Sequence, residues 1–331
     1  MIKEGISKQL DSRGDGEPLF VLSFDVEEHD RIEVAAGISC SAELRSEYAR
    51  RMEANTQKIL EWLAETGQRA TFFVVGEIAQ THRDLVRSIA EAGHEVAAHG
   101  WKHERVDRMS PAQFRIDVQR CKDLLEEAAG TQVWGFRAPS FSVSRQTPWV
   151  ADILVECGYR YDASVYPVRH DRYGIPAAPR GPFWLEGVCC RILELPALTW
   201  RAAGRNWAVG GGGHFRLWPL WMLRAGLQQA SRQPVPVGVL YFHPWEFDPE
   251  QPRLPLRGLA RWRTYVGIKR ATQRLQSLLR AFRFVTAADV VKHIWQKVLT
   301  LPRYRLDNGS DTKAFAIPQE AMTLPAIVDQ H

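Results

Sequence analysis

The sequence has few cysteines, and no spacing pattern joins them. There are five among 331 residues, an odd number, with no Cys-x-x-Cys pair: Cys40, Cys121, Cys157, Cys189 and Cys190. A disulfide framework and a zinc ribbon both need cysteines paired at regular spacing, so this pattern argues against either. We expect a protein that works in a reducing compartment.

Long apolar runs are also missing. No segment approaches the length of a membrane span, and the residues before Pro18 contain no apolar core of signal-peptide length. These features predict a soluble, cytoplasmic protein, which can also lie at the inner face of the cytoplasmic membrane.

The net charge of +5 is spread along the chain, except for a basic segment at 257–283. We interpret this segment as a solvated helix face, with peripheral contact to an anionic membrane surface as the alternative. No recognised nucleic-acid-binding motif accompanies it, so we expect no nucleic-acid partner.

Short apolar runs alternate with segments of helical periodicity. The expected strands are 19–25, 70–75, 94–98, 133–136, 159–161, 191–198, 236–242 and 282–286. The expected helices are 53–65, 82–92, 111–129, 147–156 and 264–280. Strict alternation favours a parallel sheet covered by helices, and the number of units favours a barrel over an open sheet. The predicted class is therefore an α/β barrel.

The expected organisation is one large domain with two rim loops. We place an N-terminal extension at 1–17, the domain at 18–300, and a polar, partly disordered tail at 305–331. Pro- and Gly-containing stretches predict the rim loops, at 164–190 and 200–215. The second loop holds the run Gly210 to Gly213, which lacks the lysine of a phosphate-binding loop and is interpreted as a hinge.

Histidines and acids recur where the expected strands end, which is where barrel enzymes keep their sites. His99 and His103 are four residues apart, so one helical turn or a tight loop puts both imidazoles on one side, able to share a metal ion. Surface histidines at this spacing are also common. A carboxylate from another strand end would complete a set of two histidines and one acid, and the segment SFDVEEHD at 23–30 offers one.

Asp25 ends an apolar strand, where a carboxylate has no packing role; the alternative is a cap for the next turn. Glu27 lies on the same strand face, so one acid can bind a metal while the other takes a proton from water. Arg137 emerges from apolar residues and needs a buried acid partner, which Asp25 can provide. Asp162 and His243 follow two further strands and form a candidate acid–base pair, although a lone histidine is more often a core residue. Trp245 beside His243 can stack on a sugar ring or simply pack.

Taken in order, these segments resemble the polysaccharide deacetylase family, the NodB-like carbohydrate esterases, over about residues 20–291. The resemblance implies a distorted parallel (β/α) barrel of about seven strands. It implies metal ligands at His99 and His103, and a groove wall at Arg137-Ala138-Pro139. It also implies a general acid at His243 held by Asp162, with Pro139, Ser140 and Trp245 expected to contact substrate.

The first motif departs from the family pattern, because Val26 stands where most members have a second aspartate. Either Glu27 binds the metal with Asp25 as base, or Asp25 itself binds the metal. The FDVE segment, with GGGGHFR and YFHPWEFDPEQPR, resembles a subgroup encoded with exopolysaccharide-export genes.

The predicted function is a metal-dependent N-deacetylase of amino sugars in a poly- or oligosaccharide, acting in exopolysaccharide biosynthesis. The expected cofactor is a divalent ion, zinc, with cobalt or another divalent ion as alternatives. The expected partner is an acetylated glycan or a lipid-linked oligosaccharide. Two alternatives remain: an amidase-like hydrolase of non-glycan C–N bonds on the same fold, and a catalytically silent carbohydrate-binding module.

Overall fold

The computed structural model describes residues 17–32, 35 and 37–306. Within them, ten strands form one sheet in the order β10-β1-β2-β3-β4-β5-β7-β6-β12, with β11 also paired to β1. All pairs are parallel except β6 with β7. The strands are β1 (Leu19–Val26), β2 (Thr71–Val74), β3 (Glu95–Ala98), β4 (Gly135–Phe136), β5 (Tyr161–Asp162), β6 (Phe183–Glu186), β7 (Arg191–Glu194), β10 (Val237–Phe242), β11 (Phe284–Val285) and β12 (Arg303–Arg305).

The sheet curls until its two sides meet. After β7 the chain runs on to form a parallel bridge between Ala197 and Val239 of β10. The backbone N–H of Leu198 donates to the carbonyl of Val239 at 2.9 Å. The seven strands from β10 through β1 to β7 therefore surround a common interior, which confirms the distorted, mostly parallel α/β barrel that was predicted.

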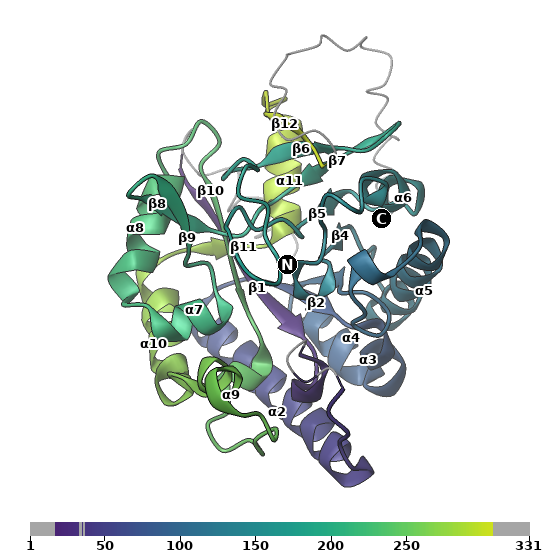
Figure 1. The fold of residues 1–331 in the computed structure, drawn as a ribbon, viewed down its shortest axis with the longest axis vertical. Coiled ribbons are helices and arrows are strands. Elements are labelled where there is room, and N and C mark those ends of the chain that lie inside the picture. Colours follow the sequence, from purple (N-terminus) through teal and green to yellow (C-terminus); the bar gives the residue numbers. More distant parts are fainter. Residues whose placement is uncertain (1–16, 33–34, 36, 307–331) are drawn as a thin grey trace.

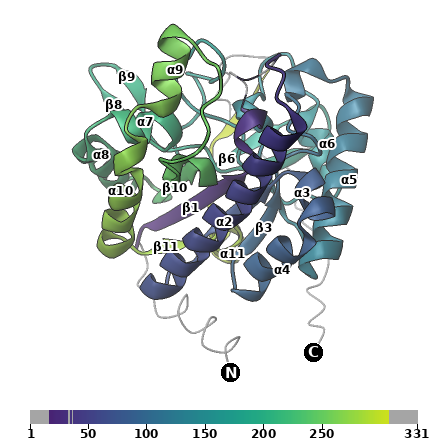
Figure 2. The same ribbon diagram turned by 90° about the horizontal axis from the view of Figure 1, so that it is seen from below.

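Helices cover the outside of the curled sheet (Figure 1). They are α2 (Ala42–Thr66), α3 (Gly76–Thr81), α4 (Arg83–Glu91), α5 (Pro111–Ala129), α6 (Val150–Glu156), α7 (Gly212–Leu217), α8 (Leu220–Ala230), α9 (Gly258–Tyr265), α10 (Ile268–Ala281) and α11 (Ala287–Gln296). The groups α3–α6 and α7–α10 lie on opposite sides, and α2 runs along the outside of β1 between them (Figure 2). Short 3₁₀ turns are η1 (His29–Arg31), η3 (Val106–Arg108), η4 (Pro139–Phe141) and η5 (Pro244–Phe247).

Strand alternation along β1 separates two cores. Leu22 and Phe24 belong to the larger apolar cluster beneath the helices. Leu19 and Val21 belong to a second cluster, shared with the strands across the barrel and with α11. Because side chains alternate along a strand, the face that carries Leu19 and Val21 also carries Asp25. The barrel interior is therefore apolar at one end and polar where β1 ends.

Helix boundaries follow their capping residues. In α5, Ser110 accepts from the backbone N–H of Gln113 and the Gln113 side chain accepts from the backbone N–H of Ser110, a capping box that precedes Pro111 at the first helical position. Gly130 ends the helix at a φ of 66°. The predicted helix over 111–129 is therefore correct at both ends.

Some expected elements differ from the observed ones. The loop expected over 200–215 is wrong, because it contains the antiparallel hairpin of β8 (Thr199–Ala202) and β9 (Arg205–Ala208) and most of α7. The expected 164–190 loop ends in β6, and the sheet continues past residue 300 into β12. The helix expected over 264–280 is two helices.

The termini bear on two further expectations. Residues 1–16 and 307–331, which hold nearly all of the expected extension and tail, lie outside the described residues. Among the helices that the structure describes, none is both long enough and apolar enough to span a bilayer.

Candidate active site

Two carboxylates leave the end of β1 on the interior face. Asp25 is 2% exposed and Glu27 is 1% exposed. Both line a cavity of about 890 Å³, with His99, His103 and His243 among the other lining residues. The structure thus brings together five residues from three segments that lie far apart in the sequence.

Asp25 is held by a buried arginine. Nη1 of Arg137 donates to Oδ1 of Asp25 at 2.6 Å and to Oγ of Ser23 at 2.9 Å. Nε of the same guanidinium donates to the carbonyl of Ala163 at 3.2 Å, and the group lies 3.9 Å from the ring centre of Phe73. The expected pairing of Arg137 with Asp25 is present, and it fixes Asp25 with its second oxygen facing the cavity.

The two histidines approach Glu27 from a loop after β3. Nδ1 of His99 lies 2.8 Å from the backbone carbonyl of Arg137. Donating there leaves Nε2 unprotonated and directed at the acids, 3.9 Å from Oε2 of Glu27 and 4.0 Å from Oδ2 of Asp25. Nε2 of His103 lies 2.6 Å from the same Glu27 oxygen. A tight loop, and not a helical turn, places this pair.

The backbone at His103 is unusual. Its φ is 61°, in the left-handed region that non-glycine residues rarely adopt. Such strain persists only where the surroundings hold it, and it is frequent at functional sites. The loop therefore gives up some backbone stability to direct the His103 ring at Glu27.

Burial and the neighbouring histidines have opposite effects on the pKa of Glu27. Burial favours the neutral acid, but the charges of His103, His243 and His99 outweigh it and hold the pKa of Glu27 well below its usual range. Burial lowers the pKa of His99 to about 4. An ionised Glu27 and a neutral His99 are the protonation states that metal ligation requires.

The donor set fits a divalent ion. One ligand atom each from Glu27, His99 and His103 lie within 4.8 Å of one another. Oε2 of Glu27 is buried, and although Nε2 of His103 lies 2.6 Å away, the two atoms do not meet hydrogen-bond geometry. Two imidazoles and one carboxylate are a common ligand set for catalytic zinc, and they leave coordination positions for water and substrate. The geometry favours Glu27 over Asp25 as the third ligand, because Asp25 is engaged by Arg137.

His243 is oriented by a neighbouring glutamate. Oε1 of Glu246 lies 2.7 Å from Nδ1 of His243 and accepts from the backbone N–H of the same residue at 3.0 Å. Arg216 holds the other oxygen of Glu246 at 2.6 Å. Nε2 of His243 then faces the cavity, 3.8 Å from Oδ2 of Asp25. Burial alone would lower the pKa of His243, but the hydrogen bond to Glu246 and the nearby carboxylates raise it to about 9.

Asp162 does not hold His243, which corrects the pair expected from the sequence. Its carboxyl accepts from the hydroxyl of Ser164 and faces the buried Glu194. Burial raises the pKa of Asp162 to about 6, and burial and the charge of Asp162 raise that of Glu194 well above its usual value. Two buried acids this close disfavour each other's ionisation, so the pair favours keeping a proton.

Of the three residues expected to contact substrate, Ser140 and Trp245 line the cavity and Pro139 does not. Ser140 lines the cavity, with a φ of 56°, whereas Pro139 is buried and does not line it. Trp245 lines the cavity too, but its ring stacks on His243 at 5.3 Å between centres, and its Nε1 donates to Oε1 of Glu27 at 3.4 Å. Trp245 therefore packs against His243 and bonds to Glu27 in addition to lining the cavity.

Sequence reasoning missed Glu246, Arg216 and Ser23. A signal for Glu246 exists in His-Pro-Trp-Glu, because a polar residue, a proline and a glutamate three positions on form a capping box. Arg216 and Ser23 have no such local signal, because their partners come from distant segments.

Comparisons with known proteins divide the chain into two parts. Residues 46–161 match the polysaccharide deacetylase family model, and residues 163–292 match a domain of unknown function, DUF3473. His99, His103 and Arg137 lie in the first part. His243 and Glu246 lie in the second.

Curated relatives match only a segment. A peptidoglycan deacetylase from Helicobacter pylori is 28% identical over 113 residues, which cover 34% of this chain and 38% of that protein. A peptidoglycan deacetylase-like protein from Gibberella zeae is 29% identical over 110 residues, 33% of this chain and 32% of its own length. The chain thus spans about a third of the length of these relatives.

Solved structures extend the likeness to the whole barrel. A candidate polysaccharide deacetylase from Mycobacterium smegmatis superposes with a TM-score of 0.57 at 22% identity, over 88% of this chain and 94% of its own. An allantoinase superposes with a TM-score of 0.57 at 17% identity, over 86% and 92%. At these identities the structures show the shared fold alone. Over residues 46–161, the chain is similar to the polysaccharide deacetylase family and to segments of curated deacetylases.

Proposed function

We propose that this protein is a metal-dependent hydrolase that removes N-acetyl groups from amino sugars of a poly- or oligosaccharide. The observation that carries the proposal is the convergence of Glu27, His99 and His103 beside Asp25 and His243 in one cavity. The family match and the deacetylase names of the curated relatives support the same reaction.

Glu27, His99 and His103 would hold the divalent ion, zinc or another such as cobalt. When bound there, a divalent ion would polarise the acetamide carbonyl and ease the deprotonation of water. His99 is suited to ligation because its Nδ1 is fixed on the carbonyl of Arg137, which orients the ring.

Asp25 is the proposed general base. Arg137 occupies one of its oxygens and the other faces the cavity, so the carboxylate is held in a fixed orientation. It accepts a proton from the water whose oxygen attacks the acetamide carbon.

His243 is the proposed general acid. Glu246 fixes one proton on Nδ1, and because the pKa of His243 is raised to about 9, Nε2 carries a second proton and faces the cavity, 3.8 Å from Oδ2 of Asp25. As the carbon–nitrogen bond breaks, His243 gives a proton to the nitrogen, and the products are a free amino sugar and acetate.

The proposal also covers the residues that contact the substrate and the form of the glycan. Ser140 and Trp245 are proposed to contact the sugar from the cavity wall, with Pro139 holding the wall from behind. The exopolysaccharide role rests on the resemblance of the FDVE and GGGGHFR segments. A lipid-linked precursor is the proposed form of the glycan if the protein acts inside the cell.

Peripheral contact with a membrane is a further part of this proposal. Helix α9 leaves Leu259 and Trp262 about half exposed beside Arg261, at the edge of the catalytic cavity. Apolar and basic side chains on one exposed helix suit an anionic bilayer surface. Co-sedimentation with vesicles containing an anionic lipid should fall in the Leu259→Ser/Trp262→Ser variant, and equal sedimentation would exclude the contact.

Acetate release from a panel of N-acetylated oligosaccharides tests the reaction. We expect release that a chelator abolishes and added zinc restores, and that His99→Ala eliminates. His82→Ala is the matched control, because His82 lies outside the cavity. Full acetate release by His99→Ala, or release indifferent to the chelator, would refute the metal-dependent assignment.

The fold also suits a different amide substrate, because an allantoinase shares it. Small linear and cyclic amides therefore belong in the same panel, and turnover of these alone would favour the amidase alternative. A catalytically silent carbohydrate-binding module is the third candidate. Binding of glycans without bound metal and without turnover under any condition would favour it.

A further inference from the structure

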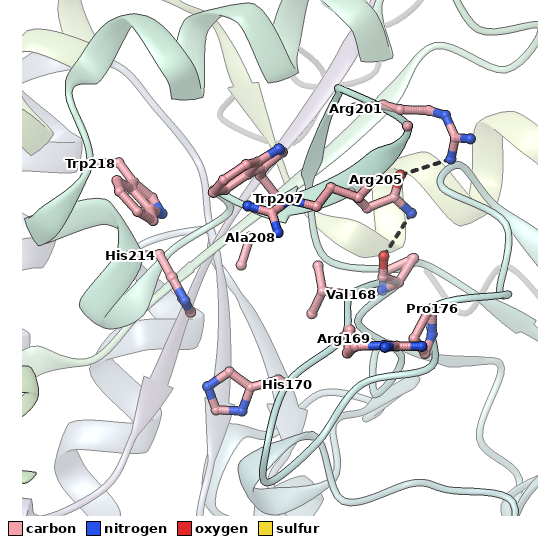
Figure 3. Close-up of a pocket in the computed structure, with 13 residues that line it drawn as sticks. Val168, Arg169, His170, Pro176, Arg201, Arg205, Trp207, Ala208, His214 and Trp218 are labelled. Atoms are coloured by element: carbon pink, nitrogen blue, oxygen red, sulfur yellow. Dashed lines mark hydrogen bonds between the residues drawn. The ribbon is translucent and has the colours of Figure 1, made fainter.

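A second cavity of about 540 Å³ opens beside the catalytic one. We call it the basic pocket. Its lining residues come from the loop after β5, from the β8–β9 hairpin and from α7 with the residue that follows it: Pro167, Val168, Arg169, His170, Pro176, Arg201, Gly204, Arg205, Asn206, Trp207, Ala208, His214 and Trp218. Figure 3 shows Trp207, Trp218 and His214 on one side of this pocket and Val168, Arg169 and His170 on the other.

The two cavities adjoin. Arg169, His170, His214 and Trp218 line both of them. The basic pocket is therefore next to the cavity that holds Asp25, where a neighbouring sugar unit of a bound glycan would lie.

The pocket carries positive charge that its own lining does not neutralise. Three arginines and two histidines line it, and no carboxylate among the described residues does so. Arg201 contacts the amide oxygen of Asn206 at 3.3 Å, and the guanidinium of Arg205 lies 3.7 Å from the ring centre of Trp207. Both partners are neutral. Asp171, which follows His170 in the sequence, contacts His170 at 3.1 Å and Arg263 at 3.5 Å.

His214 is a largely buried, neutral residue of the pocket lining. Burial and the charges of His170 and Arg263 lower its pKa to about 4, so His214 stays neutral at pH 7 and is free to donate or accept a hydrogen bond.

The pocket also presents aromatic surface. Trp207 and Trp218 pack edge to face at 5.9 Å between ring centres. Nε1 of Trp218 is buried, and no described residue accepts its hydrogen bond. Indole rings suit the apolar face of a sugar, and an unpaired N–H suits an oxygen on it.

One hydrogen bond fixes the shape of the pocket. Nδ2 of Asn206 donates to the carbonyl of Pro167 at 2.8 Å and joins the β8–β9 hairpin to the loop opposite. The hairpin that carries Arg201 and Arg205 is therefore held in a fixed position against the opposite loop.

We propose that the basic pocket binds the carboxylate or phosphate of an anionic sugar unit next to the acetylated sugar that is cleaved. This inference rests on the proposed function for the location of the cleaved group. Every lining residue falls within 163–292, so the segment that matches the domain of unknown function would supply this anion site as well as His243.

Binding of three probes tests the proposal by calorimetry, in an Asp25→Asn background that stops turnover. The probes are a hyaluronan tetrasaccharide, with a carboxylate on alternate sugars, UDP-N-acetylglucosamine, with a pyrophosphate, and neutral chitotetraose. The variant is Arg169→Gln/Arg201→Gln/Arg205→Gln, and Arg205→Gln alone serves if the triple variant does not fold. Arg224→Gln on α8 is the matched control, exposed and outside both cavities.

We expect at least one anionic probe to bind more tightly than chitotetraose and to lose about tenfold or more in affinity in the triple variant. Chitotetraose binding should change little, and Arg224→Gln should leave all three affinities intact. Loss for hyaluronan alone identifies a carboxylate, and loss for UDP-N-acetylglucosamine alone identifies a phosphate.

The proposal is overturned if neither anionic probe exceeds chitotetraose, or if the triple variant binds both as the parent does. This readout is separate from acetate release. If the protein releases no acetate from any glycan but shows the expected binding differences, the proposed reaction is refuted and the proposed anion site is supported.

Discussion

Nδ1 of His243 and a carboxylate oxygen of Glu246 lie 2.7 Å apart at the start of η5. The same oxygen accepts the backbone N–H of His243, and Arg216 holds the other oxygen. The four-residue segment His243 to Glu246 therefore supplies the orienting acid that the sequence analysis assigned to Asp162, on a different strand.

Replacement of Glu246 by Gln should lower kcat about 10- to 100-fold with a smaller effect on KM, because His243 loses its fixed orientation and proton. Steady-state acetate release measures this. Asp162→Asn is the control, and we expect a kcat near that of the parent, since Asp162 contacts Ser164 and Glu194 and not His243. A larger loss in Asp162→Asn than in Glu246→Gln would restore the original pairing.

Substitutions of Glu27 and of Asp25 should have different effects on the affinity of the protein for a metal ion. Glu27→Gln should lower the affinity for zinc at least about tenfold, because it removes the charge of a ligand. Asp25→Asn should keep the metal and lose acetate release. Metal content after dialysis, measured by mass spectrometry, distinguishes the two variants. The reverse result would make Asp25 the third ligand.

Arg137→Met should destabilise the fold by about 3–5 kcal/mol, because it leaves Asp25 buried and unpaired. The double variant Arg137→Met/Asp25→Asn should recover part of this loss. Urea unfolding of the parent, both single variants and the double variant gives the coupling between the residues. Additive losses would mean that Arg137 stabilises the barrel through its other contacts, with Ser23 and Ala163.

Stability should depend on pH through Glu95 at the start of β3. Burial raises its pKa from 4.5 to about 7 in the folded state, against hydrogen bonds from Ala288, Thr71 and Tyr161. A raised pKa in the folded state means that its stabilising contribution is complete below about pH 4.5 and is lost as the pH rises through about 7.

Glu95→Gln mimics the neutral acid and removes this dependence. Between pH 5 and pH 8 the stability of the parent should fall by up to about 3 kcal/mol relative to Glu95→Gln. Urea unfolding at both pH values measures the difference. A constant difference between the two proteins would show that Glu95 does not titrate in this range.

The sequence predicts the barrel well because its central strands are apolar runs that are buried on both faces. β1 and β10 are buried along their whole length, so their composition alone marks them. The β8–β9 hairpin escapes prediction because its faces mix tryptophan with arginine and it lies at the surface. Its two-residue turn is Ala203-Gly204, with φ of 49° and 75°, and alanine is not a residue that signals such a turn.

The site is predictable where chemistry is local and less so where it is assembled from distant segments. His99 with His103, and Arg137 with Asp25, follow from residue types that have no packing role where they stand. The choice of Glu27 over Asp25 as a ligand depends on which oxygen faces the cavity, which three-dimensional contacts decide. The distinction between Asp162 and Glu246 is of the same kind.

The glycine run shows how one motif changes meaning in three dimensions. A Cβ at Gly211 would lie 1.6 Å from the carbonyl oxygen of Tyr241, because this segment bridges to β10. A Cβ at Gly213 would find its nearest atom at 3.5 Å. The run interpreted as a hinge therefore includes a position where only glycine allows two backbones to meet.

The pairing of β1 with β10 also sets an order of events during synthesis. The hydroxyl of Ser23 donates to the carbonyl of Leu240, 217 residues further along. At roughly 5–20 residues per second, a ribosome needs roughly 10 to 40 seconds to make that stretch. During this time β1 lacks its neighbour on one side, and the acids at its end lack His243. The proposed active site is therefore complete only when the barrel closes, and a chain cut short before β10 leaves an open strand edge for chaperones or proteases to recognise.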